Sequence, residues 1–319
     1  MHLIYNPIFL EHDTGMYPEN MKRLLALGNL PVEEIDNGEE YLTLFHTPEY
    51  IDKIKRASHE GIYINADTIV SSKSYEAAIM AVGASVMASQ SGDFAIIRPP
   101  GHHAHPNHSS GFCLFNNTAI ATQKLVNEGK RVLIIDFDGH LGDGTEKFFY
   151  NTDKVMFWSI HQFPAFPGGG DADEIGDGIG KGYTINVPLP PGSGDEIFLD
   201  AFNTFLPAAI EFAPDVVAIS AGFDSHQSDL MLDLRFSVNS FYKIGKLIYE
   251  NFKNVFAVLE GGYNMEAFPK SLFNFLAAMN GKEMIYQENE TDSTIQTYYE
   301  YEGRAYLARQ LLSKYWKSL

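Results

Sequence analysis

The stretch RVLIIDFDGHLGDGT, residues 131–145, places a run of aliphatic residues directly before a cluster of acidic residues and a histidine. Its apolar part, Val132–Ile135, contains no polar side chain, which is typical of a strand buried on both faces, as in a parallel sheet. The sequence predicts four more buried strands from runs of the same kind: Phe94–Ile97, Val155–Trp158, Val216–Ile219 and Val255–Leu259.

Segments with helical spacing of apolar residues lie between these runs. Ser193, followed three residues later by Glu196, predicts a capping box at the start of one helix, which Pro214 closes. The polar, acid-rich stretch Tyr286–Gly303 predicts a flexible excursion before the last helix. The expected helices are Ser74–Ala88, Asn116–Leu125, Asp195–Phe212, Phe241–Tyr249, Leu272–Met279 and Arg304–Lys317.

The alternation of strands and helices predicts an α/β fold with a mainly parallel sheet flanked by helices. No linker, repeat or low-complexity segment divides the chain, so we expect one domain over residues 1–319. Ligands in such sheets bind beyond the carboxyl ends of the strands. We therefore expect a site among the segments that follow the five runs: Arg98–His103, Asp136–His140, Ser159–His161, Ser220–His226 and Glu260–Tyr263.

Asp138, His140 and Asp224 are the candidate metal ligands. One imidazole and two carboxylates leave a coordination position open, as catalytic metal sites require. The spacing of Asp138 and His140 suits an extended segment, in which alternate side chains share a face. Each residue alone is better explained as a turn or core residue, but the set at matching strand ends favours a metal. Zinc is the first choice, and these ligand types also allow Fe(II).

His102 and His103, which follow a Pro-Pro-Gly sequence, are the candidate acid–base pair. Adjacent residues on an irregular loop can face one cavity, where one of them takes a proton from metal-bound water. By itself, a His-His pair is more typical of a surface loop. Tyr263 follows two glycines that allow a close backbone approach, and its hydroxyl can donate to a developing oxyanion. Its alternative role is to close the top of the sheet.

The composition limits the partners. The formal net charge of −18 and the isoelectric point near 4.9 argue against direct nucleic-acid binding. The single cysteine, Cys113, cannot form an internal disulfide, which favours a reducing, cytoplasmic compartment. No secretory signal is visible, and no apolar stretch approaches the roughly 20 residues that span a membrane, so we expect no membrane partner.

Six motifs occur in a fixed order: Arg98-Pro-Pro-Gly-His-His-Ala104, Gly111-Phe-Cys-Leu-Phe-Asn-Asn117, Asp136-x-Asp138-x-His140, Ser159-x-His161, Ala221-Gly-Phe-Asp224 and Glu260-Gly-Gly-Tyr263. Together they resemble the histone deacetylase and acetylpolyamine amidohydrolase family, from about His12 to the helix after Pro269. The resemblance implies the single-domain α/β fold that this family shares with arginases. It also implies hydrolysis of an acetyl amide on a lysine or polyamine nitrogen, with release of acetate.

The resemblance implies a role for each matching residue. His103 would be the general base that later protonates the leaving amine, and Tyr263 would polarise the substrate carbonyl. The zinc ligands would be Asp138, His140 and Asp224. The partner histidine and the carboxylates that hold the imidazoles would be His102, Asp136 and Asp143. A structural potassium ion is implied near Asp136, Asp138, His140 and Ser159.

The substrate-binding residues implied by the resemblance are Gly111, Phe112, Phe166 and Met231. The two phenylalanines would be the aromatic walls of an acyl-lysine tunnel, and apolar walls suit a methylene chain that sheds water. Met231 would occupy the rim position that carries a glutamate in polyamine-selective relatives. The chain departs from the family pattern at Leu141, where a second histidine is usual, and at Tyr17-Pro18-Glu19, where His-Pro-Glu is usual. Because Leu141 is not a ligand position, we expect a change in packing rather than in metal binding.

Three alternatives to an acyl-lysine deacetylase are weighed against the residues. An acetylpolyamine deacetylase shares the chemistry, and the acidic charge attracts both cationic substrates, but the apolar Met231 favours acetylated lysine in a peptide or protein. An arginase-like ureohydrolase would need an acidic ligand where Gly142 stands and another where His226 stands. A non-catalytic binding protein would not need His102, His103 and Tyr263. The sequence leaves the oligomeric state open.

Overall fold

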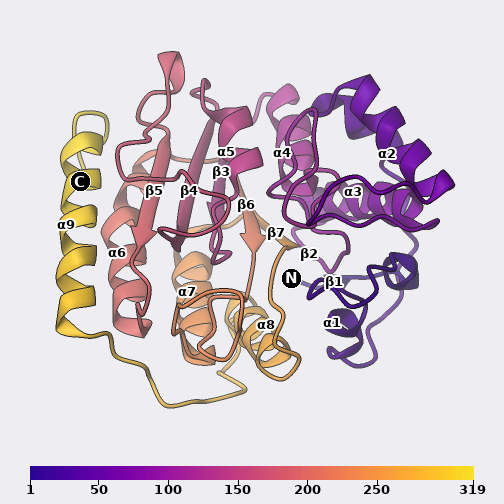
Figure 1. The fold of residues 1–319 in the computed structure, drawn as a ribbon. Helices are drawn as coiled ribbons and strands as arrows, with labels where there is room; N and C mark the ends of the chain where they lie inside the picture. The colour runs from indigo at the N-terminus through magenta and orange to yellow at the C-terminus, as the bar shows by residue number, and fades with distance from the viewer.

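The computed structural model describes residues 1–319, with a seven-stranded sheet at the centre (Figure 1). The strand order is β1-β2-β7-β6-β3-β4-β5, and every neighbouring pair is parallel. The predicted α/β fold with a parallel sheet is therefore confirmed. The strands are Leu3–Ile4 (β1), Phe94–Ala95 (β2), Val132–Asp136 (β3), Val155–Gln162 (β4), Thr184–Leu189 (β5), Val216–Ala221 (β6) and Val255–Leu259 (β7).

The register of the central strands explains why their carboxyl ends form one edge. Asp136, the last residue of β3, pairs with Ser159 of β4 on one side and with Ser220 of β6 on the other. Every residue of β3 is buried, because helices cover both faces of the sheet at this point. The segments that leave β3 and β6 therefore begin side by side, which brings distant parts of the sequence to one place.

Helices flank the sheet, with α3 against α4 and with α6, α7 and α8 packed in succession (Figure 1). A hydrophobic cluster of 78 buried residues joins helices and strands into one core, as expected for a single-domain fold. None of the helices combines the length and the apolarity needed to cross a membrane. The helices are Lys22–Leu25 (α1), Pro48–Glu60 (α2), Ser74–Ser91 (α3), Asn117–Asn127 (α4), Asp143–Phe149 (α5), Asp195–Glu211 (α6), Val238–Asn251 (α7), Ala267–Met279 (α8) and Ile295–Leu312 (α9).

The two edge strands, β1 and β5, are absent from the sequence prediction. β1 is only two residues long, too short to produce a hydrophobic pattern. β5 contains Asn186 and Pro188. Proline is tolerated there because β5 has a partner on one side only, and in a sequence it argues against a central strand.

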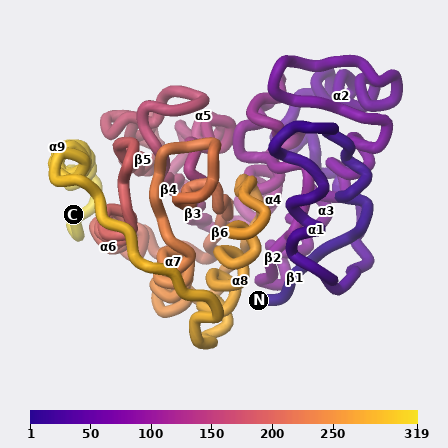
Figure 2. Tube along the Cα trace, turned by 60° about the horizontal axis from the view of Figure 1, so that its bottom comes forward, coloured from indigo at the N-terminus to yellow at the C-terminus, as the bar shows by residue number.

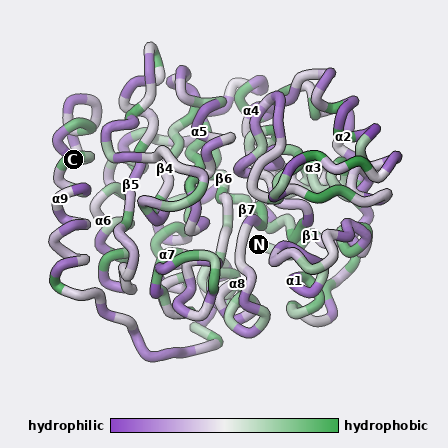
Figure 3. Tube along the Cα trace, viewed as in Figure 1, coloured by the Kyte–Doolittle hydropathy of each residue, from purple (hydrophilic) through white to green (hydrophobic).

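The predicted excursion over Tyr286–Gly303 extends too far along the chain. Helix α9 already begins at Ile295, and side chains from distant helices hold the residues before it. The Asn274 side chain accepts hydrogen bonds from the backbone of residues 285 and 286, and the Asn239 side chain bonds the backbone of Glu288 in both directions. This connection runs along the bottom of Figure 1, comes forward in Figure 2 and is largely hydrophilic (Figure 3). Its composition therefore gave a misleading signal, because its partners lie far away in the sequence.

The predicted capping box at the start of α6 is also wrong, because Gly194 rather than Ser193 occupies the N-cap position. The Ser193 hydroxyl donates to the carbonyl of Pro190, and the Glu196 carboxylate accepts from the backbone of Ser293. The connection between α8 and α9 covers this helix end, and the Asp195 amide donates to the carbonyl of Thr291. A tertiary contact therefore replaces the local cap.

Candidate active site

A cavity of about 370 Å³ opens at the carboxyl edge of the sheet. Residues at or after the ends of β3, β4, β6 and β7 lie in its walls together with loops from the first half of the chain. It contains seven of the residues expected from the sequence, and Phe112, Phe166 and Met231 provide much of its apolar lining. The full lining is Asp67, His103, Gly111, Phe112, His140, Gln162, Ala165, Phe166, Met231, Leu232 and Tyr263.

The predicted metal ligands Asp138, His140 and Asp224 come together at the base of this cavity. Their three candidate ligand atoms lie within 4.8 Å of one another, and all three residues are buried. Nδ1 of His140 is 2.9 Å from Oδ2 of Asp224 and 3.2 Å from Oδ1 of Asp138. A small cation fits this donor set, since two carboxylates and an imidazole aim at one point.

Backbone groups hold the two carboxylates in place. The Gly139 amide donates to Asp224 at 2.8 Å, and the Gly261 amide donates to Asp138 at 2.7 Å. A Cβ atom at Gly261 would lie 2.5 Å from Oδ2 of Asp224 and 2.6 Å from Oδ2 of Asp138. The glycine after Glu260 therefore allows the backbone to approach the site closely enough to orient its ligands.

The charge of the site also suits a cation. Burial lowers the pKa of His140, but the carboxylates of Asp224 and Asp138 outweigh this effect and raise the pKa to about 10. The pocket thus stabilises positive charge at the imidazole. A bound divalent cation would take over this role, because a ligating histidine must be deprotonated.

Each histidine of the predicted acid–base pair contacts its own carboxylate. His102 Nδ1 is 3.1 Å from Asp136 Oδ2, and His103 Nδ1 is 2.8 Å from Asp143 Oδ1. Burial and the neighbouring His102 lower the pKa of His103 to about 4. Burial also lowers the pKa of His102, but nearby carboxylates, Asp138 first, raise it well above its ordinary value. His103 is therefore neutral at pH 7 and, with Nδ1 engaged, can accept a proton at Nε2.

Tyr263 lines the same cavity as His103 and His140. Its ring centroid is 5.8 Å from that of Phe112, and the Arg23 guanidinium lies 5.0 Å over its ring. Its backbone amide donates to Asp229 at 2.7 Å, which fixes the start of this loop. Burial raises the pKa of the Tyr263 hydroxyl well above its ordinary value, so it remains a hydrogen-bond donor.

The aromatic walls depend on an unusual backbone. Gly111 has φ +51°, and Phe112 is a non-glycine residue with φ +67°. A Cβ atom at Gly111 would lie 2.4 Å from the ring of His103, so only glycine fits there without displacing the histidine. Left-handed conformations of non-glycine residues are costly and occur preferentially at functional sites. Phe166 forms the facing wall, with its centroid 5.1 Å from that of His103.

Four lining residues escaped the sequence prediction: Asp67, Gln162, Ala165 and Leu232. Asp67 lies in a loop before α3 with no motif around it, and it accepts a hydrogen bond from the Gly111 amide at 3.2 Å. Gln162 had a usable signal, because it is the last residue of β4. The prediction ended this strand at Trp158, four residues too early, since Ser159 and His161 interrupt the apolar run.

Two histidines at the strand ends lie outside the cavity. His161 contacts Ser159 Oγ at 2.9 Å and the Gly170 carbonyl at 3.0 Å. His226 contacts Glu288 at 2.9 Å, on the connection between α8 and α9. Both are buried and bonded within the protein, so their role is structural. Leu141 is buried in the core beside Gly170.

The segment Tyr17-Pro18-Glu19, which departs from the family pattern, takes part in a buried ion-pair network through Glu19. Glu19 accepts from Arg98 at 2.8 Å and from Arg23 at 3.1 Å. Burial raises the pKa of Glu19, but the two arginines outweigh it and bring the pKa to about 2. Arg23 also donates to the carbonyl of Gly262 at 2.7 Å. The network therefore ties the amino-terminal loop to the segment that carries Tyr263.

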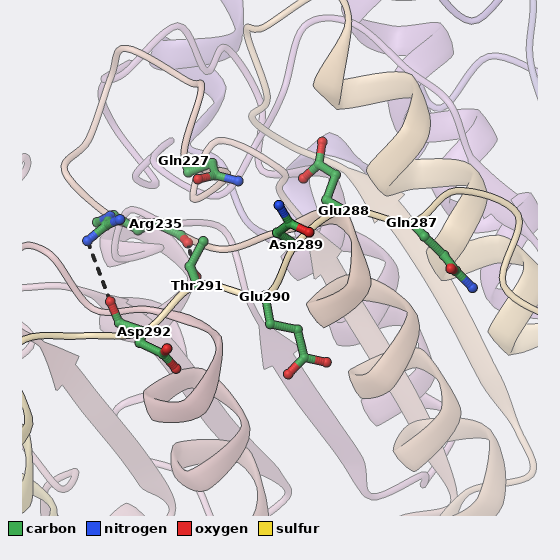
Figure 4. Close-up of a pocket in the computed structure, with 8 residues that line it drawn as sticks. All are labelled: Gln227, Arg235, Gln287, Glu288, Asn289, Glu290, Thr291 and Asp292. Carbon is green, nitrogen blue, oxygen red and sulfur yellow. Dashed lines mark hydrogen bonds between the residues drawn. The ribbon is translucent and has the colours of Figure 1, made fainter.

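A larger surface hollow of about 880 Å³ lies away from this chemistry (Figure 4). It is lined only by polar residues, mostly from the connection between α8 and α9. Of these, Arg235 donates to the Asp292 carbonyl at 3.5 Å. The smaller cavity is the better candidate active site because it contains metal-ligand candidates, a neutral imidazole and apolar walls.

Comparison with known proteins agrees with this geometry. The model of the histone deacetylase domain matches residues 14–279. A probable deacetylase of Archaeoglobus fulgidus is 35% identical over 311 residues, which cover 88% of this chain and 87% of that protein. Histone deacetylase 10, chloroplastic, of Oryza sativa subsp. japonica is 35% identical and covers 85% of this chain and 71% of its own length. The crystal structure of the HDA15 HD domain superposes with a TM-score of 0.90 at 28% identity and covers 99% of this chain and 95% of that chain.

Proposed function

This chain belongs to the histone deacetylase family of amide hydrolases, and from that premise we propose that it removes acetyl groups from lysine side chains of peptides or proteins. The observation that carries the proposal is that three kinds of group lie in or directly beside one cavity. These are the metal-ligand set Asp138, His140 and Asp224, the neutral base His103, and the hydroxyl donor Tyr263.

The proposed mechanism assigns one task to each group. A divalent cation held by the ligand set would supply a Lewis acid that acidifies water and polarises a carbonyl. His103 accepts the proton of the attacking water at Nε2 and later delivers it to the leaving amine nitrogen. Asp143 fixes His103 through Nδ1. The ring of His102, which contacts Asp136, packs against the ring of His103. Tyr263 donates its hydroxyl hydrogen to the oxygen of the developing tetrahedral centre.

Replacement of Tyr263 by Phe is expected to lower kcat by roughly 10²–10³, the usual cost of one oxyanion donor. The ring contacts with Phe112 and Arg23 do not involve the hydroxyl, so the walls and the thermal stability are expected to be retained. Steady-state kinetics on an acetyl-lysine peptide check this. A kcat close to that of the wild type would leave Tyr263 with a packing role only.

The cavity walls favour a lysine over a polyamine. Five lining side chains are apolar: Phe112, Ala165, Phe166, Met231 and Leu232. The methylene chain of a lysine gains about 0.8 kcal/mol for each buried CH₂. An acetylpolyamine carries a further ammonium group a few methylenes from the amide, and an unpaired ammonium in an apolar wall is costly. Asp67 is the only carboxylate of the lining, and it already accepts from the Gly111 amide and the Thr68 hydroxyl.

A parallel panel of an acetyl-lysine peptide, longer acyl-lysines and acetylated polyamines tests this selectivity. We expect the highest kcat/KM on acetyl-lysine. The variant Met231→Glu adds a carboxylate at a position that is 37% exposed. It is expected to shift the ratio of kcat/KM towards the polyamine by about 5-fold, as about 1 kcal/mol of half-exposed ion pairing gives. Met231→Gln is the neutral control. Equal ratios in both variants would mean that a charge at residue 231 does not set the selectivity, and a wild type that prefers the polyamine would favour the acetylpolyamine alternative.

The remaining assignments belong to the same proposal. Zinc is the proposed catalytic ion, with Fe(II) as the alternative, and a structural potassium ion is proposed near Asp136 and Ser159, which are neighbours in the sheet. Residues 1–319 are proposed to act as one catalytic domain, in the cytoplasm, where the buried thiol of Cys113 stays reduced. A ureohydrolase is disfavoured because residue 142, where its second acidic ligand would stand, is glycine. A Cβ atom added at Gly142 would lie 2.3 Å from Oδ2 of Asp136, so a larger residue does not fit there.

A further inference from the structure

Asp143, the carboxylate that holds the proposed base, contacts a second histidine. Its Oδ1 is 2.8 Å from Nδ1 of His103, and its Oδ2 is 2.7 Å from Nε2 of His105. A carboxylate accepts, so both imidazoles donate. Each oxygen of Asp143 thus has its own imidazole donor, and His105 is the only side-chain donor to Oδ2. His105 lies next to the motif that ends at Ala104 and has no role in the mechanism above.

The chain around His105 is built to hold this ring. The His105 amide donates to the His108 carbonyl at 2.9 Å, and the two rings stack with centroids 4.2 Å apart and planes at 10°. The Thr47 amide at the start of α2 donates to the Pro106 carbonyl at 2.9 Å. The Asn116 side chain donates to the Ala104 carbonyl at 3.2 Å. Contacts from two other segments therefore fix the turn that presents His105 to Asp143.

His105 has no direct access to the reaction. It is not among the residues that line the cavity, and it can affect His103 only through the shared carboxylate. Asp143 is buried less completely than the metal ligands, with its side chain 21% exposed. Burial alone would raise the pKa of Asp143, but the hydrogen bonds from His103 and His105 lower it well below its ordinary value. The carboxylate therefore stays ionised and able to accept from both.

We infer that His105 is a positioning residue for the proposed deacetylase reaction, which orients the Asp143 carboxylate and thereby the imidazole of His103. This inference rests on the proposed function. With Oδ2 bonded to His105, the carboxylate cannot rotate freely, and Oδ1 stays directed at Nδ1 of His103. Nε2 of His103 is then aimed at the position where a proton must be taken and returned. Supporting residues of this kind decide how well a reacting group is held.

The variant pair His105→Leu and His105→Gln tests the hydrogen bond. Leucine keeps an apolar side chain of useful size and removes the donor, whereas glutamine keeps an N–H group that can reach Asp143. For His105→Leu we expect kcat on an acetyl-lysine peptide to fall about 10-fold. Residues that hold a reacting group without touching the substrate typically contribute about 10–100-fold to activity. The low end applies here because His105 is 17% exposed and water can reach Oδ2 of Asp143. KM is expected to stay unchanged, since His105 does not touch the cavity. His105→Gln is expected to recover most of kcat.

His59→Leu is the matched control, because it removes an exposed histidine of α2 and no contact with His105 or Asp143. It is expected to keep kcat near that of the wild type. The inference is overturned if His105→Leu turns over like the wild type, if it raises KM instead of lowering kcat, if glutamine gives no recovery, or if His59→Leu loses as much. A wild type that hydrolyses no acyl-lysine would contradict the proposed function itself, which is a distinguishable result.

Discussion

Replacement of His103 by Ala is expected to lower kcat for acetyl-lysine hydrolysis by about 10³-fold or more while the protein keeps its metal. General acid–base groups contribute about 10²–10⁴ to a rate, and His103 serves in both steps, as base and as acid. The geometry supports this role, since burial and His102 keep its pKa at about 4 and Asp143 occupies Nδ1. The measurement is kcat on an acetyl-lysine peptide together with the metal content.

A control variant shows whether the loss of any histidine would lower kcat. His59 is an exposed residue of α2 that does not line the cavity, so His59→Ala should hydrolyse the peptide like the wild type. Unchanged melting temperatures would show that both variants fold. If His103→Ala kept a tenth or more of the wild-type kcat, His103 would not be the base, and His102 would be the next residue to replace.

Replacement of His140 by Ala is expected to abolish both metal binding and hydrolysis. It removes the only imidazole of the ligand set and leaves the carboxyl groups of Asp138 and Asp224 close together without it. The metal content measured by elemental analysis is expected to fall from about one zinc-class ion per chain to almost none. Added zinc should raise the melting temperature of the metal-free wild type but not that of the variant, because a ligand stabilises only the form that binds it.

The control for the metal experiment is His103→Ala, which lies in the same cavity but contributes no ligand. It is expected to retain the ion. Unchanged metal in His140→Ala would mean that the ion lies elsewhere and that the three-residue set is not its site. Loss of metal from both variants would point to a general collapse of the cavity instead.

The candidate site residues could be predicted because many of them follow buried strands. Apolar runs such as Val132–Ile135 are short, pure and easily recognised, and polar residues directly after them belong to the ligand-binding edge. Asp138, Asp224 and Tyr263 were found in this way, and the structure brings them together. The same reasoning also placed His161 and His226 at that edge, but both turn to partners within the protein. A strand end therefore indicates which edge a side chain is near, and not the direction in which it points.

Other features depend on contacts that no local pattern encodes. The pairing of Glu19 with Arg98 joins residues 79 positions apart. The contact of His105 with Asp143 joins residues 38 apart. The expected cap of α6 failed because the chain near Thr291 covers that helix end. In each case a distant backbone or side-chain group takes the place of the local partner that the sequence suggests.

One metal ion at Asp138, His140 and Asp224 is proposed to make this chain an acetyl-lysine hydrolase. Titration of the metal-free wild type with zinc, while acetate release from an acetyl-lysine peptide is followed, tests it most directly. We expect no release before zinc is added, a rate that rises in proportion to zinc, and a plateau at one equivalent per chain. Hydrolysis at full rate without metal, or no acetate release at any loading with zinc or Fe(II), would contradict the claim.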